Sequence, residues 1–160
     1  MPQPQQSQQP DPDPCVPPFI TPGSSGCYYV DTTVVNFTTA RSLCSDQGGR
    51  LVEIDSQEKQ DEITEYLANN PILASSGYWM GATDEAEEGS YVWSTSGREV
   101  TFFYWEGGQP GPGATTMQRQ DCLALNSKWY DVECGLTRGA ICETGESRLT
   151  CQYIGQHSLF

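Results

Sequence analysis

Seven cysteines in a chain of 160 residues constrain the fold more than any other feature of the sequence. Cysteine at this density is typical of small disulfide-bonded domains that fold outside the reducing cytosol. The cysteines never have Cys-x-x-Cys spacing, and the one histidine, His157, lies near the C-terminus, so we expect no structural zinc. The sequence therefore predicts a secreted, extracellular domain that is stapled by disulfides.

The number and spacing of the cysteines do not by themselves say which of them pair. Cys15 and Cys27 bracket a turn that contains Pro and Gly, and residues 28–30 after it are typical of the start of a strand. We therefore expect this pair to close an N-terminal hairpin.

The charge of the chain narrows the classes of partner. Acidic residues outnumber basic ones by 21 to 8, which gives a formal net charge of -13. This charge argues against nucleic acid and anionic membranes as partners, and it favours cations, basic surfaces or simple solubility. The sequence has no apolar run near the ~20 residues that span a bilayer, so we expect no membrane insertion. Because no hydrophobic signal segment follows Met1, we expect a mature form or a piece of a larger protein.

The order of elements along the chain predicts an α+β fold. Residues 1–14 are rich in Pro and Gln and should form a flexible, extended linker. A helix is expected over about residues 39–47, and Asp-Ser-Gln-Glu at residues 55–58 fits a capping box that opens a second helix. From Gly77 onward, short aromatic segments, including residues 100–105, favour strands. Helices early and strands late are typical of an α+β domain.

The sequence also carries a modification motif. Asn36, followed by Phe37 and Thr38, forms a sequon for N-glycosylation. The sequon is usable if the chain is secreted from a eukaryotic cell, so we expect a glycoprotein in that setting.

The stretch from residue 105 to residue 142 organises the chain. A loop rich in Gly and Pro, residues 107–113, is followed by short apolar segments that each carry a cysteine. This arrangement is typical of a disulfide-stapled sheet that supports an irregular binding loop. A catalytic site would need a nucleophile beside a base, and His157 near the end of the chain offers no such pair. We therefore expect a binding module and not an enzyme.

Several landmarks, taken in order, resemble the C-type lectin-like domain over about residues 15–143. They are the Cys15 and Cys27 pair, Trp79-Met80-Gly81 where the family has Trp-Ile-Gly, Gln109-Pro110-Gly111 where it has the sugar-reading Glu-Pro-Asn or Gln-Pro-Asp, and Trp129-Tyr130-Asp131 where it has Trp-Asn-Asp. The resemblance implies the long form of this domain, with an N-terminal disulfide hairpin. Its fold has two helices packed on small antiparallel sheets and a long irregular loop region. Residues 144–160 would then form a C-terminal tail.

The resemblance also implies which cysteines pair. It selects the bridges Cys15–Cys27, Cys44–Cys142 and Cys122–Cys134. Cys151 is left over in the polar tail. This residue could link to a second chain in a disulfide-linked dimer, or it could stay free.

The family's principal site holds a calcium ion that ligates the sugar hydroxyls. Calcium needs roughly 6–8 oxygen ligands, several of them charged. Gly111 has no side chain where the family has Asn or Asp, Gln120 is neutral where it has Glu, and Tyr130 replaces its Asn. Asp131 is the acid that remains. The resemblance therefore implies a degenerate calcium and sugar site, with its ligand loop at Gln109, Pro110, Gly111, Gln120, Trp129, Tyr130 and Asp131.

Two further groups match calcium sites of the family. The auxiliary site is matched at Asp84, Glu88 and Asp121, and a distal site is matched at Val52 (through its carbonyl), Glu58 and Glu143. Extracellular sites of this kind bind calcium weakly, on the order of 10⁻⁴–10⁻³ M. Helix capping by Glu58 and a plain surface position for Glu143 are the alternatives to the distal site. Calcium is thus expected as a structural ion, if it is bound.

The sequence predicts a recognition module that binds a glycan, in innate immune or cell-surface recognition. One alternative is a calcium-independent module that binds a protein ligand through the same long-loop face. Another is an acidic protein that binds a mineral or ice surface, although no regular flat array of ligands is visible in the sequence.

Overall fold

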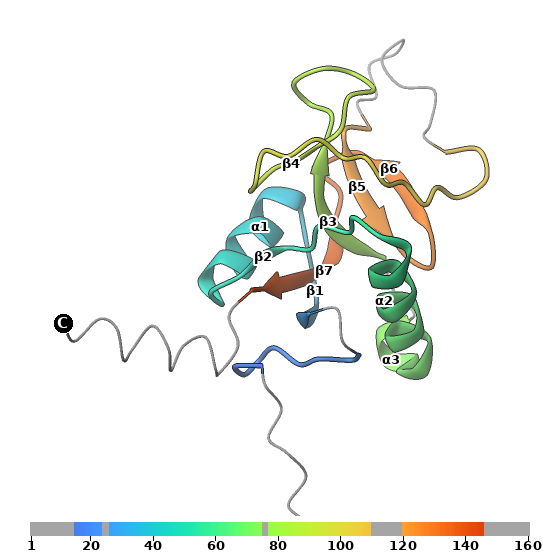
Figure 1. Cartoon of the computed structure of the whole chain (residues 1–160). Coiled ribbons are helices and arrows are strands. Elements are labelled where there is room, and N and C mark those ends of the chain that lie inside the picture. Colours follow the sequence, from blue (N-terminus) through green and yellow to red (C-terminus); the bar gives the residue numbers. More distant parts are fainter. Residues whose placement is uncertain (1–14, 24–25, 75–76, 110–119, 146–160) are drawn as a thin grey trace, which may run out of the picture.

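The computed structural model describes residues 15–23, 26–74, 77–109 and 120–145 of the chain. Figure 1 shows how these segments are arranged. The predicted linker at residues 1–14 and most of the predicted tail lie outside the described residues, as do Pro110, Gly111 and Cys151. The proposed domain boundaries and the dimer through Cys151 therefore stay predictions.

The described residues form the α+β fold that the sequence predicts. Its elements are β1 (Cys27–Val35), α1 (Phe37–Asp46), β2 (Arg50–Leu51), α2 (Gln57–Asn69), α3 (Pro71–Ala74), β3 (Tyr78–Thr83), β4 (Val92–Trp93), β5 (Cys122–Leu125), β6 (Trp129–Val132) and β7 (Arg138–Thr144). In Figure 1, α1 and α2 lie on opposite sides of the strands, and the connections around β4 gather in the upper part of the view. None of the helices in the described residues has the length and apolar character of a membrane-spanning segment.

The strands form one mixed sheet in the order β1-β7-β3-β5-β6, with β2 added to β7 and β4 added to β3. The pairing of β3 with β7 is parallel, whereas the other ladders are antiparallel. Buried side chains cover both faces of the sheet, since Tyr78 and Met80 of β3 belong to one apolar cluster and Trp79 between them belongs to the other. This alternation is expected of a strand that is buried on both faces.

The three predicted disulfides are confirmed. Cys15–Cys27 closes the N-terminal hairpin, Cys44–Cys142 joins α1 to β7, and Cys122–Cys134 links the start of β5 to the chain just after β6. Cys44 and Cys142 are fully buried and 98 residues apart in sequence. This bridge therefore ties the first helix to the last strand across most of the domain.

Both main helices begin at a capping residue. The Oδ1 atom of Asn36 accepts a hydrogen bond from the backbone N–H of Thr39 at 2.9 Å, so α1 begins two residues earlier than the sequence predicts. Asn36 is exposed at this position, and its glycosylation stays a prediction. The α2 helix is capped by Ser56, whose Oγ accepts from the N–H of Lys59 at 3.2 Å.

The capping box predicted at residues 55–58 is shifted by one position. With Ser56 as the N-cap, the third helical residue is Lys59 and not Glu58. The expectation that Glu58 caps the helix is therefore wrong. Glu58 stays in the first turn, and the cationic Lys59 stands at the third helical position. Glu58 is exposed.

The strand predicted over residues 100–105 is also wrong. This segment has an isolated bridge between Trp105 and Trp129 and otherwise has no regular secondary structure. Phe102, Tyr104 and Trp105 nevertheless pack against the core. Their hydrophobicity reflects this packing and not membership of the sheet.

Candidate functional site

The predicted ligand face lies where the segment after Tyr104 runs beside β6, an edge strand. The backbone N–H of Trp129 donates to the carbonyl of Tyr104, and the N–H of Glu106 donates to the carbonyl of Trp129, both at 2.8 Å. Gln109 continues this pairing with its side chain, because its Oε1 accepts a hydrogen bond from the N–H of Asp131 at 3.2 Å. The structure therefore brings Gln109 and Asp131 together at the edge of the sheet.

Trp129 and Tyr130 point to opposite faces of the sheet. The indole Nε1 of Trp129 donates to Oε1 of Gln60 at 2.6 Å, and both side chains are fully buried. Tyr130 packs against the other apolar cluster, where its hydroxyl accepts from Nε of Arg138 at 3.2 Å. Because side chains alternate along a strand, Asp131 returns to the Trp129 face. The Tyr130 side chain thus belongs to the scaffold, on the face away from Asp131.

The remaining predicted residues of the ligand loop are placed only in part. Gln120 is half-buried directly before the buried Asp121. Pro110 and Gly111 lie outside the described residues. The degeneracy of the principal calcium and sugar site rests on residue types in the sequence and stays a prediction.

Asp84, Glu88 and Asp121 come together as the auxiliary site predicts. Each offers a carboxylate oxygen, and these atoms lie within 4.8 Å of one another. Asp84 follows β3 and Asp121 precedes β5, and the N–H of Asp84 donates to the carbonyl of Asp121 at 2.9 Å. Asp84 is 2 % exposed and Asp121 is 6 % exposed, whereas Glu88 is at the surface. We call these three residues the loop cluster.

One buried oxygen of the loop cluster has no partner. Oδ2 of Asp84 accepts a hydrogen bond from the N–H of Gly89 at 2.9 Å, but its Oδ1 has no hydrogen-bond partner in the described residues. An unpaired buried polar atom is costly. Burial raises the pKa of Asp84 to about 6, although the Gly89 hydrogen bond opposes the shift. The charges of Glu88 and Asp121 add to it, as does a side-chain hydrogen bond with Asp121 that requires a proton on Asp84.

The donor set of the loop cluster fits a hard cation. Calcium prefers carboxylate oxygens, and an unpartnered carboxylate oxygen beside two further carboxylates is an atom that such an ion would satisfy. Asp84, Glu88 and Asp121 are therefore the residues that would hold calcium here. The bound ion would neutralise their charge and connect the two chain segments that flank the long loop.

Tyr91 links the loop cluster to the ligand face. Burial raises the pKa of its hydroxyl well above the ordinary value, and the charges of Asp84 and Asp131 raise it further. The tyrosine ring packs on Trp105 with centroids 5.5 Å apart and on Phe103 at 6.2 Å. The Tyr91 hydroxyl therefore stays protonated, among carboxylates from both candidate sites.

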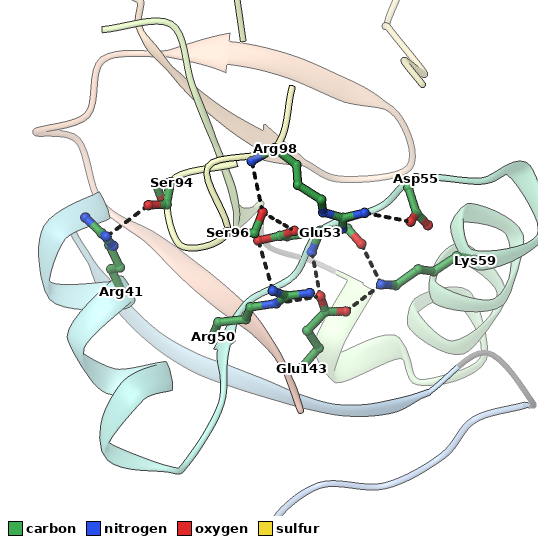
Figure 2. A network of polar contacts seen from close by, with 9 residues as sticks. All are labelled: Arg41, Arg50, Glu53, Asp55, Lys59, Ser94, Ser96, Arg98 and Glu143. Carbon is green, nitrogen blue, oxygen red and sulfur yellow. Dashed lines mark hydrogen bonds and ion pairs between the residues drawn. The ribbon is translucent and has the colours of Figure 1, made fainter. Parts of the chain in front are cut away.

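A second acidic group lies at the other predicted calcium site, but cations of the chain already contact it. Glu143 pairs with Lys59 at 2.5 Å and with Arg50 at 3.2 Å. The carbonyl of Val52 accepts from the N–H of Gly81 at 2.9 Å, as part of the packing of β3. Figure 2 shows the Lys59 and Arg50 side chains approaching Glu143 from different sides.

Glu85 and the Cys122–Cys134 disulfide do not form a metal site. Oε1 of Glu85 lies 3.2 Å from Sγ of Cys134 and 3.9 Å from Sγ of Cys122. Because these two sulfur atoms are bonded to each other, neither is a thiolate that could ligate an ion.

Sequence reasoning missed Lys59 and Tyr91. Lys59 could have been suspected from its position, three residues after Ser56, in a first helical turn where a cation opposes the helix dipole. The environment of Tyr91 had no such signal, since its aromatic and acidic neighbours come from segments far apart in the chain.

Comparison with known proteins identifies the wider group. Residues 33–144 match the family model described as the lectin C-type domain. Salivary C-type lectin 1 of Aedes albopictus is 30% identical over 117 residues, which cover 69% of this chain and 76% of the relative.

Solved structures of similar fold include two carbohydrate-recognition domains. The domain of mouse scavenger receptor C-type lectin has a TM-score of 0.71 and 28% identity, and the match covers 81% of this chain and 97% of that one. The domain of cow CD23, solved in the presence of a GlcNAc2Man3 oligosaccharide, has a TM-score of 0.69 and 27% identity, and the match covers 82% of this chain and 96% of that one.

Proposed function

The chain belongs to the family of C-type lectin domains, and we propose that it is a secreted recognition module that binds a glycan. The proposed binding face is formed by Gln109, Asp131 and the chain around them. The proposed role is binding without catalysis, in cell-surface or innate immune recognition. Two of the similar proteins support this assignment. One is a carbohydrate-recognition domain, and the other is a salivary C-type lectin.

One observation carries the proposal, namely the unpartnered Oδ1 of Asp84 within the loop cluster. Burying the Asp84 carboxylate beside Glu88 and Asp121 without a cation is destabilising, because unpaired buried charge is costly. Calcium bound there would stabilise the base of the long loop. The segments next to Asp84 and Asp121 would then be held in place for the ligand.

The ion in the loop cluster is proposed to act on the loop and not on the sugar. Direct sugar coordination would need charged ligands in the principal site, where Gln109 already accepts a hydrogen bond from Asp131. The glycan would instead be held by hydrogen bonds from the loop itself. Calcium would raise affinity by pre-organising that loop, because a rigid loop loses less conformational freedom on binding.

The test is a glycan array, probed once in millimolar calcium and once in chelator. We expect binding of a limited set of glycans in calcium and weaker binding of the same set in chelator. Asp84→Asn should weaken binding in calcium to the level seen in chelator. Glu87→Gln is the matched control, because Glu87 is an exposed acid of the same loop that is not in the loop cluster.

A blank array in both conditions would sink the glycan proposal. A second candidate is a protein ligand that binds the same face without being coordinated by calcium. It is favoured because the Gln109 side chain already accepts a hydrogen bond from the backbone N–H of Asp131. An array that is blank while a surface-immobilised partner protein still binds, with or without calcium, would support that candidate.

A further inference from the structure

We infer that the end of the domain around Glu143 carries its own cation, the ammonium group of Lys59, in place of a bound metal ion. Loss of Lys59 should then open a calcium site at this place. The proposal concerns the scaffold, and it holds whatever ligand the long-loop face binds.

The contacts of Lys59 are those that a hard cation would make. Its Nζ lies 2.5 Å from Oε2 of Glu143 and 2.5 Å from the backbone carbonyl oxygen of Glu53. Carboxylate and backbone carbonyl oxygens are the ligands that calcium takes in proteins. An ammonium group is also a compact charge with three donors, so it can satisfy the same oxygens without a metal.

The other oxygen of Glu143 is engaged as well. Its Oε1 accepts from Nε of Arg50 at 3.2 Å and from the backbone N–H of Glu53 at 3.1 Å. Glu143 is 7 % exposed. Both oxygens of this buried carboxylate are therefore paired with a cation, which leaves little reason for the native chain to recruit a metal ion.

Glu53 completes the balance of charge in this group. Its side chain is 1 % exposed, and it pairs with Arg98 at 3.0 Å and with Arg50 at 3.4 Å. Arg98 also contacts Asp55 at 3.7 Å. Three acids therefore contact three bases, as Figure 2 shows. The acids are Glu53, Asp55 and Glu143, and the bases are Arg50, Lys59 and Arg98.

The acids around Lys59 offset the cost of its position in the helix. Lys59 stands in the first turn of α2, where the helix dipole disfavours a positive charge. The carboxylate of Glu143 and the carbonyl of Glu53 offset this cost. The loop cluster is the opposite case, since Oδ1 of Asp84 is buried without a partner. The group around Glu143 is thus neutralised by cations of the chain, since even Oε2 of Glu53, which has no hydrogen-bond partner in the described residues, lies 3.4 Å from Nη1 of Arg50. Within the part of the chain that the structure describes, the loop cluster has no such cation and is left for an external ion.

The experiment removes the internal cation in a background that lacks the external one. In the Asp84→Asn chain, calcium should not raise Tm by binding at Glu143. Any difference in Tm between calcium and chelator should therefore remain when Glu143→Gln is added. Adding Lys59→Ala should lower Tm in chelator and create an upward shift of several degrees in millimolar calcium. Terbium luminescence should show the gained ion, with an apparent Kd on the order of 10⁻⁴–10⁻³ M.

Two further variants make the test specific. Lys59→Arg retains a cation and should gain no calcium response. Glu143→Gln, added to the Lys59→Ala chain, should abolish the gained response. If Lys59→Ala does not fold, Lys59→Met keeps the aliphatic stem and serves in its place.

Two results would overturn the inference. One is a folded Lys59→Ala or Lys59→Met chain that gains no ion. The other is an ion bound by the Asp84→Asn chain with Lys59 intact that disappears with Glu143→Gln, because Glu143 would then hold metal in the native protein. This second measurement needs no variant of Lys59, so it stands even if removing that lysine prevents folding.

Discussion

The ammonium nitrogen of Lys59 lies 2.5 Å from a carboxylate oxygen of Glu143, although 84 residues separate the two in sequence. The contact joins the first turn of α2 to the last strand, β7. It neutralises a buried carboxylate that would otherwise resemble a metal ligand. The two acidic groups of the domain therefore differ in kind, because one is neutralised internally and the other is not.

Replacing Lys59 by Met should destabilise the fold by about 3–5 kcal/mol, because it leaves the buried Glu143 with one cation fewer. The free energy of unfolding in urea, measured in chelator, gives this value. Lys128→Met is the control, since Lys128 is exposed and contacts a ring at 5.7 Å; its loss should be below about 1 kcal/mol. Equal losses in the two variants would contradict the account.

The calcium-free protein should become less stable as pH rises from about 4 to about 6. Asp84 has its folded-state pKa raised from 3.8 to about 6, so between these values the folded state holds a proton that the unfolded state has released. Stability from this proton is present at lower pH and is lost as pH rises through the folded pKa. Urea unfolding in chelator across this range measures the slope.

Asp84→Asn supplies the control for this pH dependence. The difference between the native and Asp84→Asn profiles isolates the one carboxyl from the other acids of the chain. Millimolar calcium should offset the loss of stability in the native chain, more at pH 7 than at pH 5, because protons compete with the ion for Asp84. Parallel profiles for the two chains would rule out the raised pKa.

Removing the Cys44–Cys142 bridge should cost more than removing Cys15–Cys27. In the chain-entropy model, the lost stability is about 4.7 kcal/mol for the long loop and about 3 kcal/mol for the short one, since the sequence separations are 98 and 12 residues. Paired Cys→Ala variants compared by urea unfolding test the order. A larger loss for the short bridge would show that packing, and not loop closure, dominates.

Tyr130→Phe should leave ligand binding unchanged while it removes the hydrogen bond from Arg138. The expected loss of stability is about 1 kcal/mol.

Gln109→Ala should instead weaken binding on the glycan array severalfold, because it removes the side chain that holds the loop to Asp131. The reverse pattern would place Tyr130, and not Gln109, at the ligand face.

The family resemblance and local sequence rules together predicted much of the scaffold. The Cys44–Cys142 and Cys122–Cys134 bridges followed from the family resemblance. The start of α1 was predicted to within two residues, and that of α2 was predicted from a capping box that lies one residue away. The strand predicted over residues 100–105 failed because aromatic side chains there pack on the core without backbone pairing. Hydrophobic patterning reports burial, and it does not say whether a buried segment joins a ladder.

The site was harder to predict than the fold. Asp84, Glu88 and Asp121 were matched by family position, and the structure brings their oxygens together. Position alone could not show that Asp84 has an unpartnered oxygen or that Lys59 reaches Glu143, because both depend on contacts between distant segments. Because the N-cap of α2 is Ser56 and not Asp55, the third helical position holds Lys59 and not Glu58.

The most direct test of this account is a calorimetric titration with calcium at pH 7.4, on the native chain, Asp84→Asn and Glu143→Gln. The account predicts an ion that is bound by the native chain, retained by Glu143→Gln and lost in Asp84→Asn. An ion that survives Asp84→Asn and is lost in Glu143→Gln would contradict it, because calcium would then sit where Lys59 is inferred to replace it.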